Sequence, residues 1–303
     1  MTVLVAGGTG FVGRFIVDHL LEAGYEVAVG GRTPPAEGLF RAPVHFLPLT
    51  LDPRGPDPSA LTGVSHLVHA AFDHVPGRYR GGEGDAPDRF RRINLDGSVA
   101  LFKAARTSGA RGCVFLSSRA VYGAQASGAV LSEETAPRPD TLYGEVKLAT
   151  ERALADLAAP GFSVASLRVT GVYGPAARGE RHKWHGLFED FVAGRAIAPR
   201  CGTEVHGRDV GTAVEHMLRI PSNERETVFN VSDMLVDRRD LLALFADEAG
   251  SGGELPDAAD SAGFNPMTTA RLEALGWHPG GASLFEDTVR QLARDFLSDG
   301  KSG

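Results

Sequence analysis

Apolar and polar residues follow one another along the first half of the chain in blocks of two kinds. Short apolar runs are typical of buried strands, and longer stretches with apolar residues every three or four positions are typical of helices. Because the two kinds alternate, the pattern predicts a parallel sheet with crossover helices on both faces. We therefore expect an α/β fold with a doubly wound parallel sheet. The predicted strands cover residues 3–6, 25–29, 44–49, 65–70, 112–117, 162–169 and 227–231.

Helical spacing fills the intervals between these apolar runs. The first helix is predicted to begin near Phe11 and to end at Gly24, since glycine commonly follows the last turn of a helix. Two further helices are predicted at 94–108 and 142–158. Residues 72–89 are polar, charged and rich in glycine, which predicts a long loop over the carboxyl edge of the sheet.

The pattern loosens beyond Gly174-Pro175, and 303 residues can form either one large α/β domain or such a domain with a small lobe. We assign residues 1–175 to the main domain, with a strand and a helix returning to it from about 205–232. Residues 176–303 are assigned mainly to a smaller C-terminal lobe. The predicted features of the second half are helices near 187–193, 208–219, 237–249 and 283–297, and an exposed linker at 250–263.

Composition and charge exclude several classes of partner. The 303 residues are 43% hydrophobic and 23% charged, which is ordinary for a globular protein. A net charge of -7 argues against nucleic acid or an anionic membrane as a partner. Cys113 lies within an apolar run, so we expect a buried thiol. We expect a cytoplasmic protein, because no apolar run approaches the length of a spanning helix and the chain opens directly on a strand.

A glycine-rich turn follows the first strand and opens the first helix. In Gly7-Gly8-Thr9-Gly10-Phe11-Val12-Gly13, we expect Gly7 to permit the tight turn and Gly10 to let phosphates approach. Gly13 would let the helix lie close to the strand. The backbone N–H groups and the helix dipole can then bind a pyrophosphate, with Phe11 and Val12 beside it. A purely structural strand-to-helix turn is the alternative.

The end of the second strand bears on the choice of dinucleotide. An NAD site usually has an acidic residue there to hold a ribose hydroxyl, but this chain has Gly31 followed by Arg32. A guanidinium beside a small residue suits a 2′-phosphate, so we favour NADP(H) over NAD(H), with Arg32 as a surface cation as the alternative. Leu51 follows the third strand, where an adenine would lie.

Tyr143 and Lys147 lie four residues apart in a predicted helix. A tyrosine hydroxyl has an ordinary pKa near 10 and is a poor base at neutral pH. A lysine one turn later lies on the same helix face, where its charge favours the phenolate. Lowering the tyrosine pKa to about 7 requires roughly 4 kcal/mol. The pair can then act as a general acid or base on an alcohol oxygen.

Two serines and an asparagine support this interpretation. Ser117 and Ser118 end a predicted strand, and the carboxyl ends of strands face the cofactor crevice of a doubly wound sheet. Ser118 is expected to donate a hydrogen bond to the same substrate oxygen, unless the serines only cap the strand. Asn94 is expected to open its helix, either as an N-cap, as a supporting residue of the catalytic set, or as both.

Taken in order, these motifs resemble the extended short-chain dehydrogenase/reductase family, in its NAD-dependent epimerase/dehydratase branch. The resemblance runs through nearly the whole chain. It rests on the glycine-rich turn and on His69-Ala70-Ala71, Asn94-Leu95-Asp96-Gly97, Leu116-Ser117-Ser118-Arg119-Ala120-Val121-Tyr122-Gly123, Tyr143-Gly144-Glu145-Val146-Lys147, Leu167-Arg168-Val169-Thr170-Gly171-Val172-Tyr173-Gly174-Pro175 and Leu275-Gly276-Trp277-His278-Pro279.

The resemblance implies a Rossmann-fold dinucleotide-binding domain with a smaller C-terminal substrate lobe. It implies Ser118, Tyr143 and Lys147 as the catalytic set, supported by Asn94. It also implies a homodimer formed through the helices that begin near Asn94 and Leu142. The residues that it implies around the cofactor are Ala70, Ala71, Ser117, Tyr143, Lys147 and Val172, with 173–175 near the nicotinamide.

Departures from the family pattern limit the chemistry. Dehydratases of this family carry an acidic pair directly after the catalytic Ser or Thr, where this chain has Arg119 and Ala120, so dehydration is disfavoured. The segment before the late helix lacks the aromatic residue that sugar-nucleotide binders carry. His182 and His185 lack an acidic partner, so no metal is expected. Residues that could contact an anionic substrate, unless they are only surface groups, are Arg119, Ala120, Arg178, Arg181, Lys183, Trp184, Arg200 and Arg208.

The sequence thus predicts an NAD(P)-dependent enzyme that transfers a hydride. Its small-molecule substrate would be a secondary alcohol or carbonyl of a sugar or nucleotide sugar, with Tyr143 as the acid or base. A one-way NADPH-dependent reductase or dehydrogenase of a smaller carbonyl, sugar acid or lactone is the main alternative. A non-catalytic dinucleotide sensor is a third reading, which the complete set of Ser118, Tyr143 and Lys147 disfavours.

Overall fold

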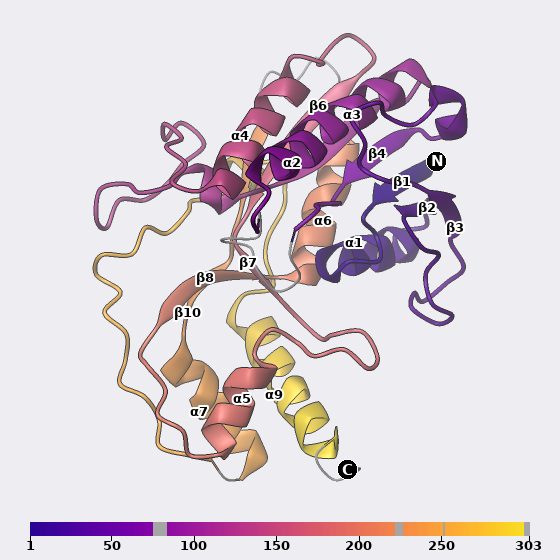
Figure 1. Ribbon diagram of the computed structural model, residues 1–303. Coiled ribbons are helices and arrows are strands. Elements are labelled where there is room, and N and C mark those ends of the chain that lie inside the picture. The colour runs from indigo at the N-terminus through magenta and orange to yellow at the C-terminus, as the bar shows by residue number, and fades with distance from the viewer. Residues whose placement is uncertain (75–83, 222–226, 251, 300–303) are drawn as a thin grey trace.

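The computed structural model describes residues 1–74, 84–221, 227–250 and 252–299. Its larger unit is built on a seven-stranded sheet in which every pairing is parallel, in the order β3-β2-β1-β4-β5-β6-β9 (Figure 1). The predicted doubly wound α/β fold is therefore confirmed. The strands are β1 (Thr2–Ala6), β2 (Glu26–Gly31), β3 (His45–Pro48), β4 (His66–His69), β5 (Gly112–Ser118), β6 (Ser163–Val169) and β9 (Val228–Val231).

Strand order reverses between β1 and β4, which are neighbours in the sheet although β2 and β3 lie between them in sequence. In open α/β sheets, ligands bind at the carboxyl ends of the strands beside such a reversal. The glycine-rich turn follows β1, and Ala70 and Ala71 follow β4. The topology thus places the predicted phosphate turn at the expected crevice.

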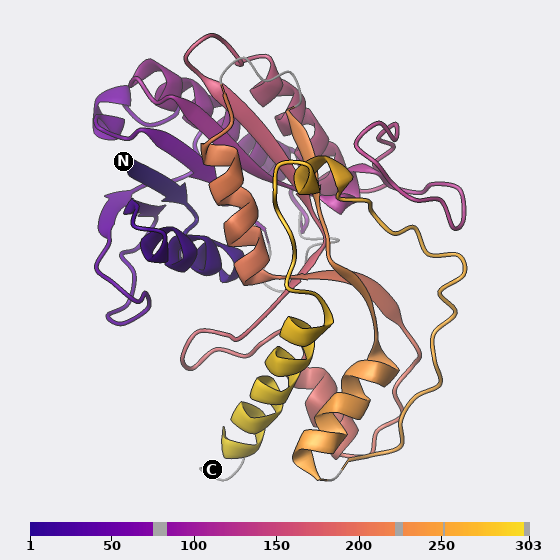
Figure 2. The ribbon, with the colours of Figure 1, turned by 180° about the vertical axis from the view of Figure 1, so that it is seen from behind.

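Helices cover both faces of this sheet (Figures 1 and 2). One face carries α1 and α6, whose apolar residues join one core cluster, and the opposite face carries α3 and α4, whose residues join another. The helices and helical turns of this unit are α1 (Phe11–Glu22), η1 (Pro58–Leu61), α2 (Pro87–Arg91), η2 (Arg92–Asp96), α3 (Gly97–Thr107), η3 (Arg119–Val121), α4 (Leu142–Ala155), α6 (Gly207–Leu218) and α8 (Ala270–Glu273).

A smaller unit lies beyond the carboxyl edge of the sheet (Figure 1). It contains a three-stranded sheet in the order β10-β8-β7 and a separate apolar core. Tyr173, Trp184, Phe188 and Phe245 are among the large buried side chains of that core. Its elements are β7 (Gly171–Tyr173), α5 (His185–Val192), β8 (Cys201–His206), β10 (Met234–Asp237), α7 (Arg238–Ala249) and α9 (Gly281–Asp299).

The two units meet at Phe15, on helix α1. A Cβ atom built on Gly207 would lie 2.1 Å from the Phe15 ring, and one built on Gly174 would lie 2.6 Å from it. The ring also packs edge-on against His206, with centroids 5.6 Å apart. The Phe15 ring therefore fills the space left by two glycines. They are Gly174, after β7, and Gly207, at the start of α6.

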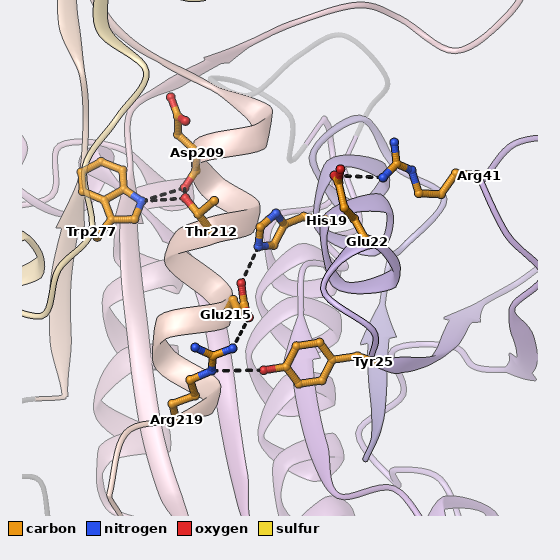
Figure 3. Close-up of polar contacts among 9 residues, drawn as sticks. All are labelled: His19, Glu22, Tyr25, Arg41, Asp209, Thr212, Glu215, Arg219 and Trp277. Atoms are coloured by element: carbon orange, nitrogen blue, oxygen red, sulfur yellow. Dashed lines mark hydrogen bonds and ion pairs between the residues drawn. The ribbon is translucent and has the colours of Figure 1, made fainter.

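Polar contacts reinforce the packing of α1 against α6 (Figure 3). His19 Nε2 lies 2.7 Å from Glu215 Oε2, and Arg219 binds the same carboxylate at 2.5 Å. Arg219 Nε also donates to the hydroxyl of Tyr25 at 3.4 Å. Near the start of α6, Trp277 Nε1 donates to the carbonyl oxygen of Asp209 at 2.9 Å, so the segment before α9 is fixed to the same helix.

Several predicted elements differ from the observed ones. The predicted loop 72–89 ends earlier, because a helix begins at Pro87; its residues 75–83 lie outside the described part of the chain. The prediction that Asn94 opens a helix is wrong, since α2, η2 and α3 form one continuous helix and Asn94 lies in its π-helical segment. Strands β7, β8 and β10 were not predicted. The linker 250–263 is only partly exposed, because Leu255 packs on the core of the smaller unit.

Candidate active site

The glycine-rich turn has the backbone geometry that a phosphate cradle requires. Gly7 has φ of +79°, and a Cβ there would lie 2.6 Å from the backbone of Ala71. A Cβ on Gly13 would lie 2.2 Å from the carbonyl oxygen of Gly7. At exposed Gly10, a Cβ would meet only the Gly7 carbonyl oxygen, at 3.3 Å. Helix α1 begins at Phe11 with no side-chain cap from Gly10, so these residues fit a dinucleotide pyrophosphate.

The other predicted cofactor residues lie around the same edge of the sheet. Arg32 is exposed directly after β2, and Leu51 follows β3, with its Cβ 3.3 Å from a Cβ built on Gly97. Ala70 and Ala71 follow β4 and are partly exposed. Val172 lies in β7 and is paired with Val205 of β8. All these positions except Val172 follow strands of the large sheet.

The end of β5 and the start of α4 are in direct contact. Ser118 Oγ accepts a hydrogen bond from the N–H of Ala120 at 3.2 Å, which leaves the hydroxyl hydrogen available for donation. Thr141 caps α4 by accepting from the N–H of Gly144 at 3.1 Å. A Cβ on Gly144 would lie 2.5 Å from the carbonyl oxygen of Ala120. Gly144, which follows Tyr143, thus packs closely against Ala120, which lies two residues after Ser118.

Lys147 is buried beside Tyr143 and holds one fixed position. Its ammonium donates a hydrogen bond to the carbonyl oxygen of Leu116, in β5, at 2.7 Å. The nitrogen lies 4.4 Å from the ring centroid of Phe72, 4.7 Å from that of Phe115 and 5.7 Å from that of Tyr143. Burial lowers the pKa of Lys147 to about 7, and the Glu151 carboxylate opposes part of that shift. The side chain can therefore exchange a proton near neutral pH.

Phe72 is a residue of this region that the sequence analysis did not select. Its ring packs edge-on against Tyr143, with centroids 5.1 Å apart, and against Phe90 at 5.4 Å. It follows the predicted cofactor residues Ala70 and Ala71 directly, and that position was the available signal. An aromatic side chain thus shields the Tyr143 and Lys147 pair on the side of α2.

Glu151 was also missed, although it lies four residues after Lys147 on the same face of α4. Its carboxylate accepts a hydrogen bond from the Ser117 hydroxyl and pairs with Arg168 Nη2 at 2.8 Å. Ser117, Glu151 and Arg168 are all buried. The Ser117 side chain therefore points toward α4 and β6, and only its backbone is left to line the crevice.

Asn94 is held by hydrogen bonds to the chain just after β4 and to its own helix. Its amide oxygen accepts from the N–H of Asp73 at 2.7 Å, and its amide nitrogen donates to the carbonyl oxygens of Asp73 and Phe90. Ser98 Oγ donates to the carbonyl oxygen of Asn94 and lies 2.7 Å from His69 Nε2. Asn94 thus fixes the chain just after β4 to the π-helical segment.

The predicted substrate residues differ in their burial and contacts. Arg119 Nη2 donates to the carbonyl oxygen of Asn265 at 2.8 Å, and its guanidinium lies 5.1 Å from the ring centroid of Phe264. Trp184 is 7% exposed and stacks on Tyr173 with centroids 5.3 Å apart, so its indole belongs to the core of the smaller unit. Ala120 is partly exposed, and the exposed ones are Arg178, Arg181, Lys183, Arg200 and Arg208.

The described residues offer neither a metal site nor a spanning helix. They contain no group of three or more His, Cys, Asp or Glu side chains that could hold a metal ion. Within the same part of the chain, no helix is both long and apolar enough to cross a membrane. Cys113 is buried, as expected, and burial raises the pKa of its thiol.

A model of the NAD dependent epimerase/dehydratase family matches residues 3–232, from β1 to the end of β9. The chain belongs to this family. Among its relatives, the UDP-glucose 4-epimerase of Streptomyces lividans is 34% identical, over 93% of this chain and 92% of that protein. A 3-beta-hydroxysteroid dehydrogenase of Mycolicibacterium neoaurum is 31% identical, over 63% of this chain and 52% of that protein. The family predicted from the sequence is confirmed, and with it the prediction of an enzyme of the short-chain dehydrogenase/reductase type.

Solved structures of this family share the fold of the whole chain. The UDP-glucose 4-epimerase of Thermus thermophilus, in complex with NAD, superposes with a TM-score of 0.76 and 26% identity, over 98% of this chain and 99% of that one. The UDP-glucose 4-epimerase of Thermotoga maritima, with UDP-glucose, reaches a TM-score of 0.78 over 99% of each chain. At 22% identity, the second likeness concerns the fold alone.

Proposed function

We propose that this epimerase/dehydratase family member transfers a hydride to and from a secondary alcohol or carbonyl of a sugar or nucleotide sugar. The observation that carries the proposal is the buried Lys147, held against β5 on the helix face that also carries Tyr143. A lysine fixed one turn from a tyrosine is the arrangement that makes a phenol hydroxyl useful as an acid or base near neutral pH.

In this proposal the chain supplies proton transfer, orientation and binding. The nicotinamide, when bound, supplies the hydride acceptor and donor. Tyr143 removes the proton from the substrate hydroxyl during oxidation and returns it during reduction. Ser118 donates its free hydroxyl hydrogen to the same oxygen and so orients it. Lys147 favours the phenolate of Tyr143 when it is charged. Asn94 and Phe72 act as positioning residues for the chain segment beside this pair.

We propose that residues 1–175, joined by 205–232, hold the dinucleotide and that 176–303 mainly bind substrate. Gly7, Gly10, Phe11, Val12 and Gly13 would hold the pyrophosphate, and Leu51, Ala70, Ala71 and Val172 would line the remaining surface. The absence of an acid at Gly31 and the exposed guanidinium of Arg32 support a preference for NADP(H) over NAD(H). Binding of both dinucleotides by calorimetry tests this preference without any substrate.

A one-way reductase of a smaller carbonyl is the second candidate function. Arg32 favours it, because NADPH suits net reduction. The two functions differ in a simple measurement. An epimerase keeps its dinucleotide through purification and shows no net change in nicotinamide absorbance, whereas a reductase exchanges and consumes it. Mass spectrometry of the co-purified ligand, followed by measurement of the absorbance of the reduced nicotinamide during turnover, distinguishes them.

We further propose a cytoplasmic homodimer formed through α3 and α4. The outer surface of α4 carries the small residues Ala149 and Ala153, which are partly exposed, together with the exposed Glu145 and Arg152. Small residues let two helices approach closely. Light scattering on the purified chain tests the dimer, with Ala149→Arg expected to produce a monomer.

A further inference from the structure

A carboxylate lies just beyond the strand end that carries the catalytic serine. Ser118, the last residue of β5, is paired in register with Val169, the last residue of β6. The chain continues from Val169 through Thr170 into β7, which begins at Gly171. Gly171 is paired in register with Glu204 of the neighbouring strand β8. Val169, the register partner of Ser118, is therefore only two residues before Gly171, the register partner of Glu204.

The Glu204 carboxylate fills the space that a side chain at position 171 would take. A Cβ built on Gly171 would lie 2.6 Å from Glu204 Oε2 and 2.9 Å from Oε1. Gly171 is not among the described glycines with a positive φ, so its backbone conformation does not require glycine. The absence of a side chain at position 171 therefore makes room for the Glu204 carboxylate and is not needed for the backbone conformation.

Lys183 holds this carboxylate in place. Its ammonium lies 2.5 Å from Glu204 Oε2, and the side chains of Lys183 and Glu204 are 30% and 13% exposed. Burial raises the pKa of Glu204, while Lys183, and then Arg200, oppose that shift. The Glu204 carboxylate can accept hydrogen bonds and the Lys183 ammonium can donate them. Together the two side chains carry little net charge, and both remain partly exposed to solvent.

This surface suits hydroxyl groups better than phosphates. A diphosphate requires cations that no carboxylate already neutralises, as Arg or Lys clusters at phosphate sites show. Two of the predicted cations are engaged within the protein, since Lys183 pairs with Glu204 and Arg119 donates to Asn265 and lies over Phe264, whereas Arg178, Arg200 and Arg208 are exposed. A carboxylate accepts hydrogen bonds from alcohols well, because an ionised acceptor strengthens the bond.

We propose that Glu204 is a specificity-determining residue that accepts a hydrogen bond from a hydroxyl of a neutral sugar or sugar lactone and disfavours nucleoside diphosphate sugars. This inference rests on the proposed function and narrows its substrate class. Lys183 acts as the positioning residue that fixes the carboxylate, and Gly171 provides its space.

The experiment compares steady-state kinetics on a panel of free neutral sugars and lactones with kinetics on UDP-sugars. Wild-type protein is expected to turn over a free sugar or lactone at least about tenfold more efficiently, in kcat/KM, than any UDP-sugar. Glu204→Gln is expected to raise KM for the free sugar by about tenfold or more, which is the scale of a lost hydrogen bond to a charged group. The kcat value and the dinucleotide Kd should change less than about threefold, because the variant leaves the machinery of hydride and proton transfer intact.

A second variant covers the case in which Glu204→Gln folds poorly. Gly171→Ala places a methyl group against the carboxylate and should raise KM in the same way without changing any charge. Gly202→Ala, also on β8, is its matched control, because nothing lies within 4 Å of a Cβ at that position. It should leave KM unchanged.

The outcomes separate this inference from the proposed function. Efficient turnover of a UDP-sugar that depends on Tyr143 would overturn the inference and leave the proposed function standing. So would an unchanged KM in both Glu204→Gln and Gly171→Ala, or a failure to turn over any free sugar or lactone. Turnover that survives Tyr143→Phe would instead count against the proposed function.

Discussion

The ammonium of Lys147 donates a hydrogen bond to the carbonyl oxygen of Leu116 at 2.7 Å, and so ties the middle of α4 to the strand that ends in Ser118. Leu116 is two residues before Ser118, and Lys147 is one helical turn after Tyr143. A single hydrogen bond between a side chain and the backbone thus sets the distance between the two hydroxyl-bearing segments of the proposed site.

Removal of the Tyr143 hydroxyl should abolish most activity. Tyr143→Phe is expected to lower turnover at least about a hundredfold, because proton transfer by a positioned side chain contributes on that scale. Dinucleotide affinity should remain largely intact. Tyr25→Phe removes a hydroxyl that contacts Arg219 on the far side of α1 and is the matched control. Turnover of Tyr143→Phe equal to that of the control would refute the proposed role.

The burial of Lys147 should make stability depend on pH. Its pKa is about 7 in the folded chain and near 10.5 when unfolded, so only the unfolded state binds this proton between those values. The free energy of unfolding should therefore rise with pH across that window, by about 1.4 kcal/mol for each pH unit. Below pH 7 the full destabilisation from burying the charged Lys147 is present. Lys147→Met should remove this dependence. Denaturant unfolding at several pH values measures it, with exposed Lys103→Met as the control; identical slopes in both variants would contradict the prediction.

The ion pair behind the site should matter more than an ion pair on the surface of the same helix. Glu151→Gln leaves the buried guanidinium of Arg168 without its carboxylate, which typically costs about 3–5 kcal/mol. Glu145→Gln breaks a half-exposed pair with Arg91, which is typically worth about 0–1 kcal/mol. Chemical denaturation of the two variants compares them directly. Equal losses would show that burial does not govern this network.

The dinucleotide preference should depend on one side chain. Arg32→Ala is expected to weaken NADPH binding by about tenfold or more, the scale of a lost charge-assisted contact with a phosphate, and to change NADH binding little. Titration calorimetry with both dinucleotides gives the two dissociation constants. If both change equally, Arg32 does not contact the 2′-phosphate position and the preference for NADP(H) is withdrawn.

Much of the larger unit could be predicted because most of its strands are buried on both faces. Residues 112–117 are almost continuously apolar, and the observed β5 extends only one residue further. The glycine-rich turn and the Tyr143–Lys147 spacing are local patterns, which sequence reads well. The strands of the smaller sheet escaped because β7 has three residues and β8 mixes Cys, Gly, Thr and Glu. Their pairing depends on partners distant in sequence.

The interpretation of Asn94 and Trp184 and the omission of Glu204 also trace to contacts with other parts of the chain, which local patterns do not reveal. Asn94 has the residue type of an N-cap, but its amide bonds Asp73, and the helix continues through it from Pro87. Trp184 has the size and chemistry of a ligand contact, yet it stacks on Tyr173 inside a core. Glu204 stood in a segment without helical or strand periodicity, and only the pairing with Gly171 revealed its place.

The ring of Phe15 has a consequence for engineering. Because it fills the room left by Gly174 and Gly207, the helix that starts at the phosphate turn packs against the chain just after β7 and against the start of α6. A chimera that grafts another lobe onto this dinucleotide-binding half would need to carry all three residues as a set. A graft that keeps Phe15 but introduces side chains at the two glycines would force the halves apart before any substrate could be tested.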